Sequence, residues 1–437
     1  MTVRASDIEK LISVGRPTIA PDGSFTVFAT SRPDVTANRN VGQLWRVDLP
    51  ADITDTTDTP GVPVRLTRGV ADRQPQISPD GTRVAFLRAD ADGAAQIFVI
   101  PAAGGEPVQA TDAQGGVGEF AWSPDSTALA YTARVAEPGR YGTVEKLDAS
   151  SEAPRRITGI RWHANGLGYL ADRPAHVFVV DAPDPFAEPF YEPAAAVRAE
   201  GENAPDTTVV AAEPRALTSG ATTHRGVVFA ADGREVLTIP DEIESDRRDL
   251  RSRLIAIATD GSGTRELVPR SWGLSISDVA VAADGAIALL ADVLGGEGGE
   301  GIDFVAPGTG LWLLDDGALG SGRGARLLTP PETMDLGEVG SHITPLGDDF
   351  LVQNRSRGRV ELLRVTRDGG IADVQVGDVE VVGHAAAGER IVSSHATESS
   401  FGEVSLLVRG RHRTLTDFGA VLRGAGLVRP VELEITG

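Results

Sequence analysis

The residues able to do chemistry in this 437-residue chain are scattered, and none of them forms a recognised catalytic motif. A nucleophilic serine in a Gly-x-Ser-x-Gly elbow is absent, because the nearest fragments, 261–263 and 273–275, lack both the pattern and its strand–turn–helix context. The seven histidines contain no His-Glu-x-x-His zinc motif, and no Gly-x-x-x-x-Gly-Lys phosphate loop occurs. The motifs therefore predict no catalytic residue, no metal site and no cofactor.

Two weaker features remain. Residues 241–246 form an acidic run that is able to bind a cation or a substrate amine, but the arginine-rich residues 247–251 follow it. We interpret the run as a solvated loop neutralised by local ion pairs. Four histidines stand near predicted strands, and we expect them to have structural or surface roles: His163, His176, His384 and His395.

Composition narrows the class of protein further. The absence of cysteine excludes disulfides, Cys-ligated zinc and a cysteine nucleophile. A net charge of −21, from 41 basic and 62 acidic residues, disfavours a nucleic-acid partner. No apolar run reaches the roughly 18 residues that span a bilayer, and the first ten residues lack the apolar segment of a secretory signal. We therefore expect a cytoplasmic protein with no membrane partner.

A repeated turn motif indicates the elements that position these residues. Pro-Asp-Gly at 21–23 and 79–81 and Pro-Asp-Ser at 124–126 each precede a short apolar strand. The serine that precedes two of these motifs suits the first position of a type I turn, proline the second and glycine the fourth. The turn at 78–81 is followed by strands at 84–87 and 96–100 and by a last strand ending near Thr111. Four short strands per unit are typical of a propeller blade.

Weaker copies of the turn begin at 231, 283, 347 and 388, and Leu-Thr closing strands recur at 66–67, 217–218, 328–329 and 415–416. The long interval between Asp125 and Asp232 is predicted to hold one blade, because no such turn interrupts it and it contains strand candidates at 176–180 and 216–218. The sequence thus predicts an all-β fold, a seven-bladed β-propeller of four-stranded antiparallel blades over residues 17–423. A long insertion, 133–215, is expected in blade three.

Both ends of the chain lie outside this repeat. Residues 6–13 predict a short helix, in which Ser6 and Glu9 form a capping box and Ile8, Leu11 and Ile12 form one apolar face. We assign residues 1–16 to this N-terminal extension. Residues 430–437 alternate apolar and polar side chains like a strand, after the seventh closing strand. We therefore expect a C-terminal extra strand within a linker segment, 424–437, and expect both ends to attach to a further domain.

These residues together resemble a known family. The segments that show the resemblance are 78–81 followed by 84–86, 96–99 followed by 104–107, and, in this order along the chain, 156–162, 165–169 and 176–181. The chain resembles the N-terminal part of prolyl oligopeptidase family serine peptidases, nearest to the acylaminoacyl-peptidase branch. The stretch 156–181 looks like the third-blade insertion of that branch, and the resemblance covers nearly the whole chain.

The resemblance implies a function. In such peptidases the propeller caps a C-terminal α/β-hydrolase domain, and the catalytic Ser, Asp and His lie on that domain. The propeller restricts entry to short peptides. The resemblance implies that this chain is a substrate-gating, non-catalytic propeller, inactive alone, whose partners are that hydrolase domain and short or N-acylated peptides. Residues 431–437 look like the first strand of the missing domain. Assembly into a homo-oligomer is left open.

The resemblance also points to three site residues. The dipeptidyl-peptidase branch holds the substrate amine with adjacent glutamates, whereas this chain contains no Glu-Glu dipeptide. Arg161, Trp162 and His163 stand at the comparable place, and we predict that they face the substrate. An arginine there could pair with a carboxyl or carbonyl group, and a tryptophan could supply an apolar contact. The alternative is that Trp162 packs in the blade core and Arg161 lies on the surface.

Two other classes of function stay open at this point. The chain could be a free-standing propeller that binds protein partners. It could also be a propeller enzyme that uses its central channel, such as a lactonase. The latter requires carboxylates and asparagines around a metal, and the sequence spacing does not locate such a cluster.

Overall fold

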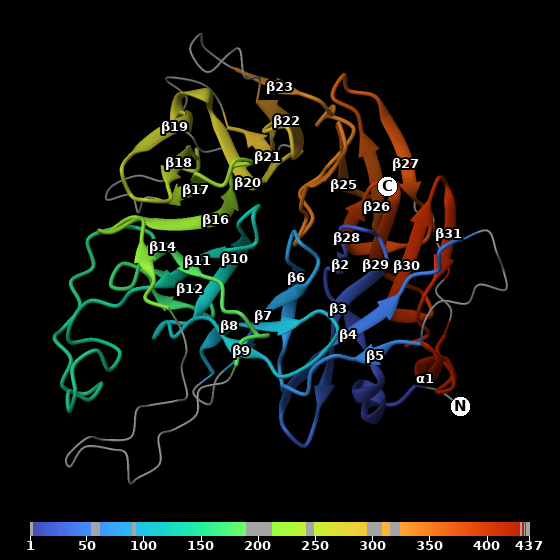
Figure 1. Ribbon diagram of the computed structural model, residues 1–437, viewed down its shortest axis with the longest axis horizontal. Coiled ribbons are helices and arrows are strands. Elements are labelled where there is room, and N and C mark those ends of the chain that lie inside the picture. Colours follow the sequence, from blue (N-terminus) through green and yellow to red (C-terminus); the bar gives the residue numbers. More distant parts are fainter. Residues whose placement is uncertain are drawn as a thin grey trace.

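The computed structural model describes residues 3–53, 62–89, 93–188, 212–241, 249–294, 308–314, 324–428, 431 and 433. In these ranges the chain is all-β, as predicted, with three short helical segments beside its strands. Figure 1 shows the sheets arranged around a common centre, with β6, β10, β16, β20 and β28 among the strands nearest to it. The sheets follow one another around this centre in chain order.

Most sheets are four-stranded and antiparallel. The first contains β1 (Ser13–Val14), β2 (Thr18–Ile19), β3 (Phe25–Asp34), β4 (Arg39–Asp48) and β5 (Val64–Arg65); the second β6 (Arg73–Ile77), β7 (Arg83–Ala89), β8 (Ala95–Pro101) and β9 (Val108–Gln109). The third contains β10 (Val117–Trp122), β11 (Ala128–Arg134), β14 (Ala175–Asp181) and β15 (Arg215–Ala216). The predicted strand at 176–180 therefore joins the sheet that begins with β10.

The later sheets repeat this order. The fourth contains β16 (Thr223–Phe229), β17 (Glu235–Asp241), β18 (Leu254–Ala258) and β19 (Thr264–Val268); the fifth β20 (Leu274–Val281), β21 (Ile287–Val293), β22 (Gly310–Leu314) and β23 (Ala325–Leu327). The last sheet has eight strands: β24 (Thr344–Leu346), β25 (Asp349–Ser356), β26 (Arg359–Val365), β27 (Ile371–Gln375), β28 (Glu380–Ala387), β29 (Arg390–Thr397), β30 (Ser400–Val408) and β31 (Arg411–Thr414). Its two halves meet where Val360 pairs in parallel with Glu380.

The Ser-Pro-Asp-Gly motif forms the turn that the sequence predicts between β6 and β7. Ser78 Oγ donates a hydrogen bond to Asp80 Oδ1 at 2.5 Å, and the backbone N–H of Thr82 donates to the same oxygen at 2.9 Å. Gly81 takes the left-handed conformation, with φ +76°. Burial opposes ionisation of Asp80, but these hydrogen bonds outweigh it and lower the pKa of Asp80 to about 2. The turn is therefore stabilised by an ionised aspartate.

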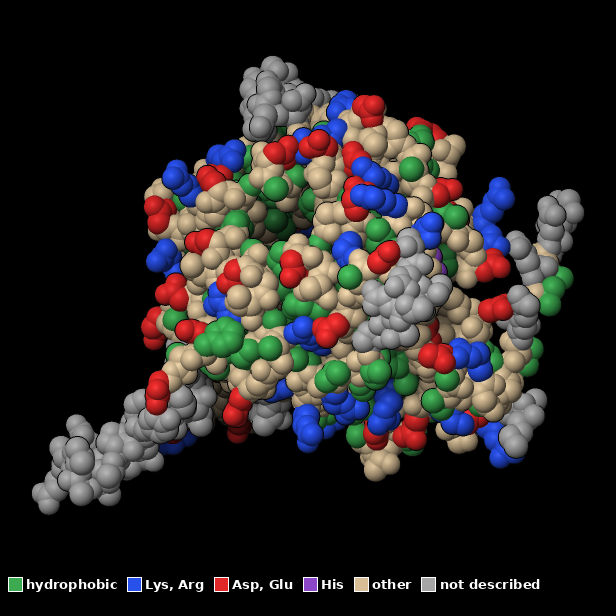
Figure 2. All heavy atoms as spheres, turned by 45° about the vertical axis from the view of Figure 1, so that its right-hand side comes forward, with side chains coloured by type: hydrophobic (Ala, Val, Ile, Leu, Met, Phe, Trp, Pro, Cys, Tyr) green, Lys and Arg blue, Asp and Glu red, His purple; other side chains and the backbone are tan. Residues whose placement is uncertain are grey.

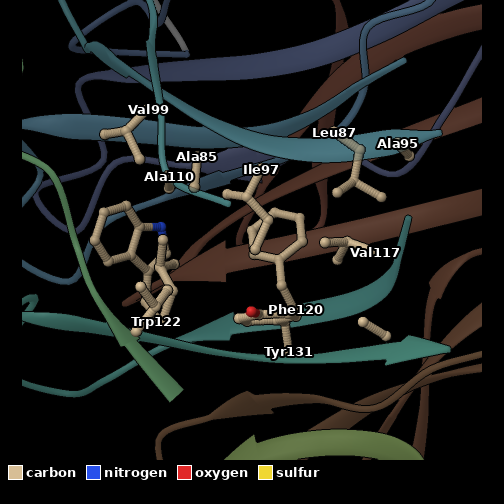
Figure 3. Packing of buried hydrophobic residues seen from close by; sticks show 13 residues of the cluster. Ala85, Leu87, Ala95, Ile97, Val99, Ala110, Val117, Phe120, Trp122 and Tyr131 are labelled. Atoms are coloured by element: carbon tan, nitrogen blue, oxygen red, sulfur yellow. The ribbon is translucent and has the colours of Figure 1, made fainter. Parts of the chain in front are cut away.

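The core consists of apolar layers between neighbouring sheets. Figure 3 shows Phe120, Trp122 and Tyr131, from the third sheet, packed toward Leu87 and Ile97 of the second. Leu87 and Ile97 are fully buried. Burial of one such side chain stabilises the fold by about 1.5–3 kcal/mol. The apolar strand residues recognised in the sequence thus hold sheet to sheet.

The predicted N-terminal helix is only partly correct. The chain forms one 3₁₀ segment, η1 (Ala5–Lys10), which ends before Leu11 takes an extended conformation. The expected Ser6–Glu9 capping box is wrong: Arg4 N donates to Asp7 Oδ2 at 2.7 Å, and Glu9 Oε1 accepts from Val35 N at 2.9 Å. Pairing of β1 with β3 extends the backbone where the local pattern favoured a longer helix.

The C-terminal extra strand predicted at 430–437 lies outside the described residues, apart from Val431 and Leu433, which are exposed and not in a strand. A short helix that the sequence did not predict, α1 (Ala420–Arg423), follows β31 and lies against η1. A further 3₁₀ turn, η2 (Arg270–Trp272), precedes β20. No described helix is long and apolar enough to cross a membrane.

Candidate functional site

The three predicted site residues lie in the segment between β11 and β14. This segment carries a small hairpin of β12 (His163–Ala164) and β13 (Gly168–Tyr169), separate from the other sheets. Gly166 at the hairpin turn and Gly168 on β13 have left-handed φ of +75° and +73°, which glycine adopts without strain. Arg161 and Trp162 directly precede the hairpin, so its position fixes theirs.

Arg161 binds a carboxylate of the chain itself. Its Nη2 atom lies 2.7 Å from Asp241 Oδ1, at the end of β17 in the next sheet. Both side chains are about one-third exposed, which limits such a pair to about 0–1 kcal/mol. Asp241 is the first residue of the acidic run, and residues 242–246 of that run lie outside the described residues. The pair ties the insertion to the fourth sheet.

Trp162 does not pack in a blade core, so that interpretation is wrong. The side chain is 38% exposed and belongs to a cluster of three rings. Its ring centroid lies 5.3 Å from that of His163 and 5.5 Å from that of Tyr169. Aromatic pairs at these distances contribute about 0.5–1.5 kcal/mol. The cluster gives the hairpin an ordered, partly exposed aromatic face.

A cavity of about 630 Å³ opens beside this aromatic face. Trp162 and Tyr169 line it, together with Arg155, Arg156 and Asp172. Arg161 and His163 do not belong to the described lining. The structure therefore brings one of the three predicted residues, Trp162, to a cavity large enough for a small ligand.

Buried ion pairs hold the cavity wall in place. Asp172 is 6% exposed and accepts hydrogen bonds from Arg155 Nε at 2.6 Å and from Tyr141 Oη at 3.0 Å. The bond to Asp172 is the main cause of the raised pKa of Arg155. The Arg155 guanidinium also lies 4.5 Å from the Tyr169 ring centroid. Sequence reasoning missed this network, because its members are spread over thirty residues without a motif.

A second group of polar residues lies on the innermost strands. Register shifts typical of β-bulges occur in β6, β10, β16, β20 and β28, each where the strand pairs with its neighbour. A bulge turns a side chain out of the regular alternation. Glu119 and Ser277, at two of these bulges, are exposed to solvent although their strands lie near the centre (Figure 1).

The bulges also supply contacts between sheets. Glu119 Oε2 accepts from the backbone N–H of Gly226 at 3.0 Å, and Asp278 Oδ2 accepts from that of Ile343 at 2.8 Å. Burial raises the pKa of Asp278, although the Ile343 N–H acts against it. No pattern in the sequence marks a bulge, so these axial residues escaped prediction.

Two buried histidines, His342 and His384, lie against each other. His342 and His384 stack with ring centroids 4.0 Å apart and are 5% and 0% exposed. Burial lowers the pKa of His342 to about 3 and that of His384 well below its ordinary value. Both rings are therefore neutral at pH 7. Within the described ranges, no three His, Asp or Glu side chains lie close enough together to hold a metal ion.

Acidic and basic side chains are interspersed on the surface that Figure 2 shows, without a large patch of one sign. This view agrees with the many surface ion pairs of the described residues, such as Arg265 with Glu235 at 2.7 Å. The excess of acidic residues is therefore spread over the surface instead of forming one acidic face on this side.

Comparison with known proteins places this fold. No family model matches the chain. Over 245 residues, it is 25% identical to the uncharacterized peptidase YuxL of Bacillus subtilis (strain 168), which covers 56% of this chain and 32% of that protein. The structure of Pyrococcus horikoshii acylaminoacyl peptidase matches with a TM-score of 0.63 and 15% identity, over 95% of this chain and 54% of that one. The β-propeller domain of the Trilobed protease from Pyrococcus furiosus, described as having an open velcro topology, matches with a TM-score of 0.58 and 12% identity, over 94% and 97%.

The predicted resemblance to peptidase propeller domains of the prolyl oligopeptidase family is confirmed. The chain spans about a third of the curated relative and about half of the acylaminoacyl peptidase. It spans nearly all of the separate propeller domain. At these identities the solved structures establish the fold, a β-propeller, and the activities of the whole peptidases are a matter for proposal.

Proposed function

We propose that this chain is the substrate-gating, non-catalytic propeller domain of a serine peptidase of the acylaminoacyl-peptidase type, acting on short or N-acylated peptides. The observation that carries the proposal is the pattern of coverage. The chain matches 97% of a separate propeller domain but 54% of a whole acylaminoacyl peptidase. In the family that the sequence resembles, the catalytic residues belong to the hydrolase domain, so the proposal assigns none to this chain.

The proposal includes seven four-stranded blades. Six four-strand groups follow β2–β5 in chain order, and the eight-stranded sheet supplies two of them, β24–β27 and β28–β31. We divide that sheet because a parallel pairing of Val360 with Glu380 joins its halves, whereas neighbouring strands within each half pair antiparallel. β1 is then an addition to the first blade. The third-blade insertion, predicted over 133–215, is shortened in this proposal to the segment between β11 and β14, because β14 and β15 belong to the third sheet.

The proposed partner surface lies at η1 and α1. These two segments lie against each other and expose Ile8 and Val421. The hydrolase domain would cover them. Trp162 and the exposed bulge residues Glu119 and Ser277 would face the peptide. The proposed compartment is the cytoplasm, in keeping with a chain that has no cysteine.

Reading the gene beyond codon 437 tests this proposal. An in-frame Gly-x-Ser-x-Gly motif within about 250 codons, the size of one further domain, is expected. The longer product should cleave an N-acetylated peptide and lose this activity on treatment with a serine-directed reagent, whereas residues 1–437 alone should show background cleavage. A stop codon after Gly437 would contradict the proposal and favour a free-standing propeller that binds protein partners.

A further inference from the structure

Arg16 occupies an unusual place at the centre of the ring. It lies in the link between β1 and β2, and β2 is next to β28 of the last sheet. The bulged part of β28 makes room for it: a Cβ atom added to Gly383 would come within 2.7 Å of Arg16 Cα and 2.9 Å of its Cβ. A glycine at 383 thus allows the backbone around Arg16 to approach the innermost strand closely.

Arg16 is exposed although its backbone lies against an innermost strand. The residue is exposed to solvent, yet burial lowers the pKa of its guanidinium. After burial, its charge further lowers the pKa of His342, in the link before β24, and of His384, on β28. Arg16 is therefore a cation that water reaches beside the innermost strand β28, where neighbouring protein groups also act on its charge.

The guanidinium has no fixed partner. Among the described residues, none forms a hydrogen bond or ion pair with the Arg16 side chain. Asp278 is the carboxylate whose charge acts on it, but the two do not reach ion-pair distance. Asp278 Oδ2 instead accepts the Ile343 N–H at 2.8 Å. Five N–H donors of a planar cation are therefore available to a ligand.

We infer that Arg16 anchors the single carboxylate of a small ligand that reaches the innermost strands, namely the C-terminal carboxylate of a short peptide. A guanidinium can bind a carboxylate through two parallel hydrogen bonds, which gives orientation as well as affinity. Burial, and to a smaller extent the charge of Glu119, raises the pKa of Asp278, and the Glu119 carboxylate in this region disfavours a polyanion. The inference rests on the proposed function, because that function brings peptides to the innermost strands.

Binding to the intact 437-residue chain tests the anchor. The probes are trialanine with a free C-terminal carboxylate and the same tripeptide as its C-terminal amide, titrated by calorimetry or NMR. The free acid should bind about tenfold or more tightly, as expected for a charge-assisted hydrogen-bonded contact. Arg16→Gln should reduce the affinity for the acid to that for the amide, and Arg16→Lys should keep part of the preference. Arg411→Gln, at an exposed arginine of the outer strand β31, is the matched control and should change neither affinity.

Three results would overturn the anchor: equal affinities for acid and amide, an Arg16→Gln variant that keeps the preference, or no saturable binding of the acid. A merely structural role of Arg16 would change the thermal stability of the variant but not the ratio of the two affinities. The test is separate from that of the proposed function. A stop codon after Gly437 together with Arg16-dependent acid binding would remove the peptidase role and leave the anchor in place.

Discussion

At the scale of single residues, the ion pair of Asp72 with Arg88 gives a prediction for stability. The Asp72 carboxylate is fully buried and binds Arg88 Nε at 2.8 Å and Nη2 at 2.9 Å. Asp72→Asn leaves the arginine charge without its partner in a largely buried place. We expect the free energy of unfolding to fall by on the order of 3 kcal/mol, measured by urea denaturation.

The control for this prediction is Asp48→Asn. Asp48 also binds an arginine, Arg46, at 2.9 Å, but its side chain is 70% exposed. We expect a loss within about 1 kcal/mol, because solvent screens such a pair. Equal losses in the two variants would show that burial does not set the strength of these ion pairs.

His342 predicts a pH dependence of stability. Burial, and secondarily the charge of Arg16, lower the pKa of its ring to about 3 in the folded chain, against about 6.5 in the unfolded chain. As the pH falls, His342 therefore binds a proton in the unfolded chain before it does so in the folded chain. The stabilisation is complete above pH 6.5 and is lost progressively as the pH falls from 6.5 toward 3.

The variant His342→Gln removes this titration. We expect unfolding free energies measured at pH 6.5, 5.5 and 4.5 to fall less steeply than in the original chain, by up to about 1.4 kcal/mol per pH unit. This window lies above the range in which most carboxylates titrate. The same slope in both proteins would contradict the buried, neutral state of His342.

The sequence led to the neighbourhood of the candidate site but not to its contacts. The resemblance placed Arg161, Trp162 and His163 in an insertion, and the structure shows one of them, Trp162, lining a cavity. It could not show that Asp241, eighty residues away, binds Arg161. Glu119 and Asp278 were equally invisible, because β-bulges depend on pairing between strands and leave no local pattern.

At the scale of elements, local chemistry predicted turns well and the N-terminal helix poorly. The Ser-Pro-Asp turn before β7 recurs before β11, where Ser123 Oγ donates to Asp125 Oδ1 at 2.6 Å. These turns depend on side chains two or three residues apart, so sequence suffices. The helix predicted at 6–13 had the right apolar spacing, but residues 13–14 instead pair as β1 with β3. This contact is distant in the sequence, so the local spacing of apolar residues does not indicate it.

Gly402 tests how β1 joins the first and last sheets. A Cβ atom at this position of β30 would come within 2.5 Å of Val14 N and 2.9 Å of Val14 Cγ2. Gly402→Ala should therefore push β1 away and cost about 1–3 kcal/mol, as overpacking does. Hydrogen exchange should accelerate at residues 13–19, measured by mass spectrometry.

The matched control is Gly263→Ala. A Cβ atom there meets no atom within 4 Å and the backbone is not left-handed, so we expect a change within about 0.5 kcal/mol. If the amide hydrogens of residues 13–19 exchange in the Gly402→Ala variant at the rate of the original chain, then β1 is not held between the two sheets.

At the scale of the whole molecule, neighbouring sheets are joined by side chains that bind the next sheet's backbone. Examples are Arg225 Nη2 to Ile276 O at 2.7 Å, between the fourth and fifth sheets, and Gln353 Nε2 to Val381 O at 2.7 Å, between the two halves of the last sheet. Where the last sheet meets the first, Arg390 Nη2 donates to Pro50 O at 2.7 Å, and an apolar cluster joins Val14 to Val404. No pairing of described strands closes the ring there. The order of the repeats was visible in the sequence, whereas this mode of closure was not.

The surface formed by η1 and α1 gives a prediction for the molecule in solution. Ile8 is 44% and Val421 53% exposed, on two segments that lie against each other. Full burial of such a side chain is worth about 1.5–3 kcal/mol, so an uncovered surface of this kind favours association between copies. We expect the chain to self-associate as its concentration rises, in sedimentation-velocity measurements.

The double variant Ile8→Ser, Val421→Ser should weaken this self-association, because it removes the apolar side chains from both segments. Val339→Ser changes an exposed valine elsewhere, 92% accessible, and should leave association unchanged. A chain that stays monomeric at high concentration, with slow amide exchange over residues 3–16, would contradict the prediction. The segment would then be stable without a partner, and the proposed hydrolase contact would have to lie on another part of the ring.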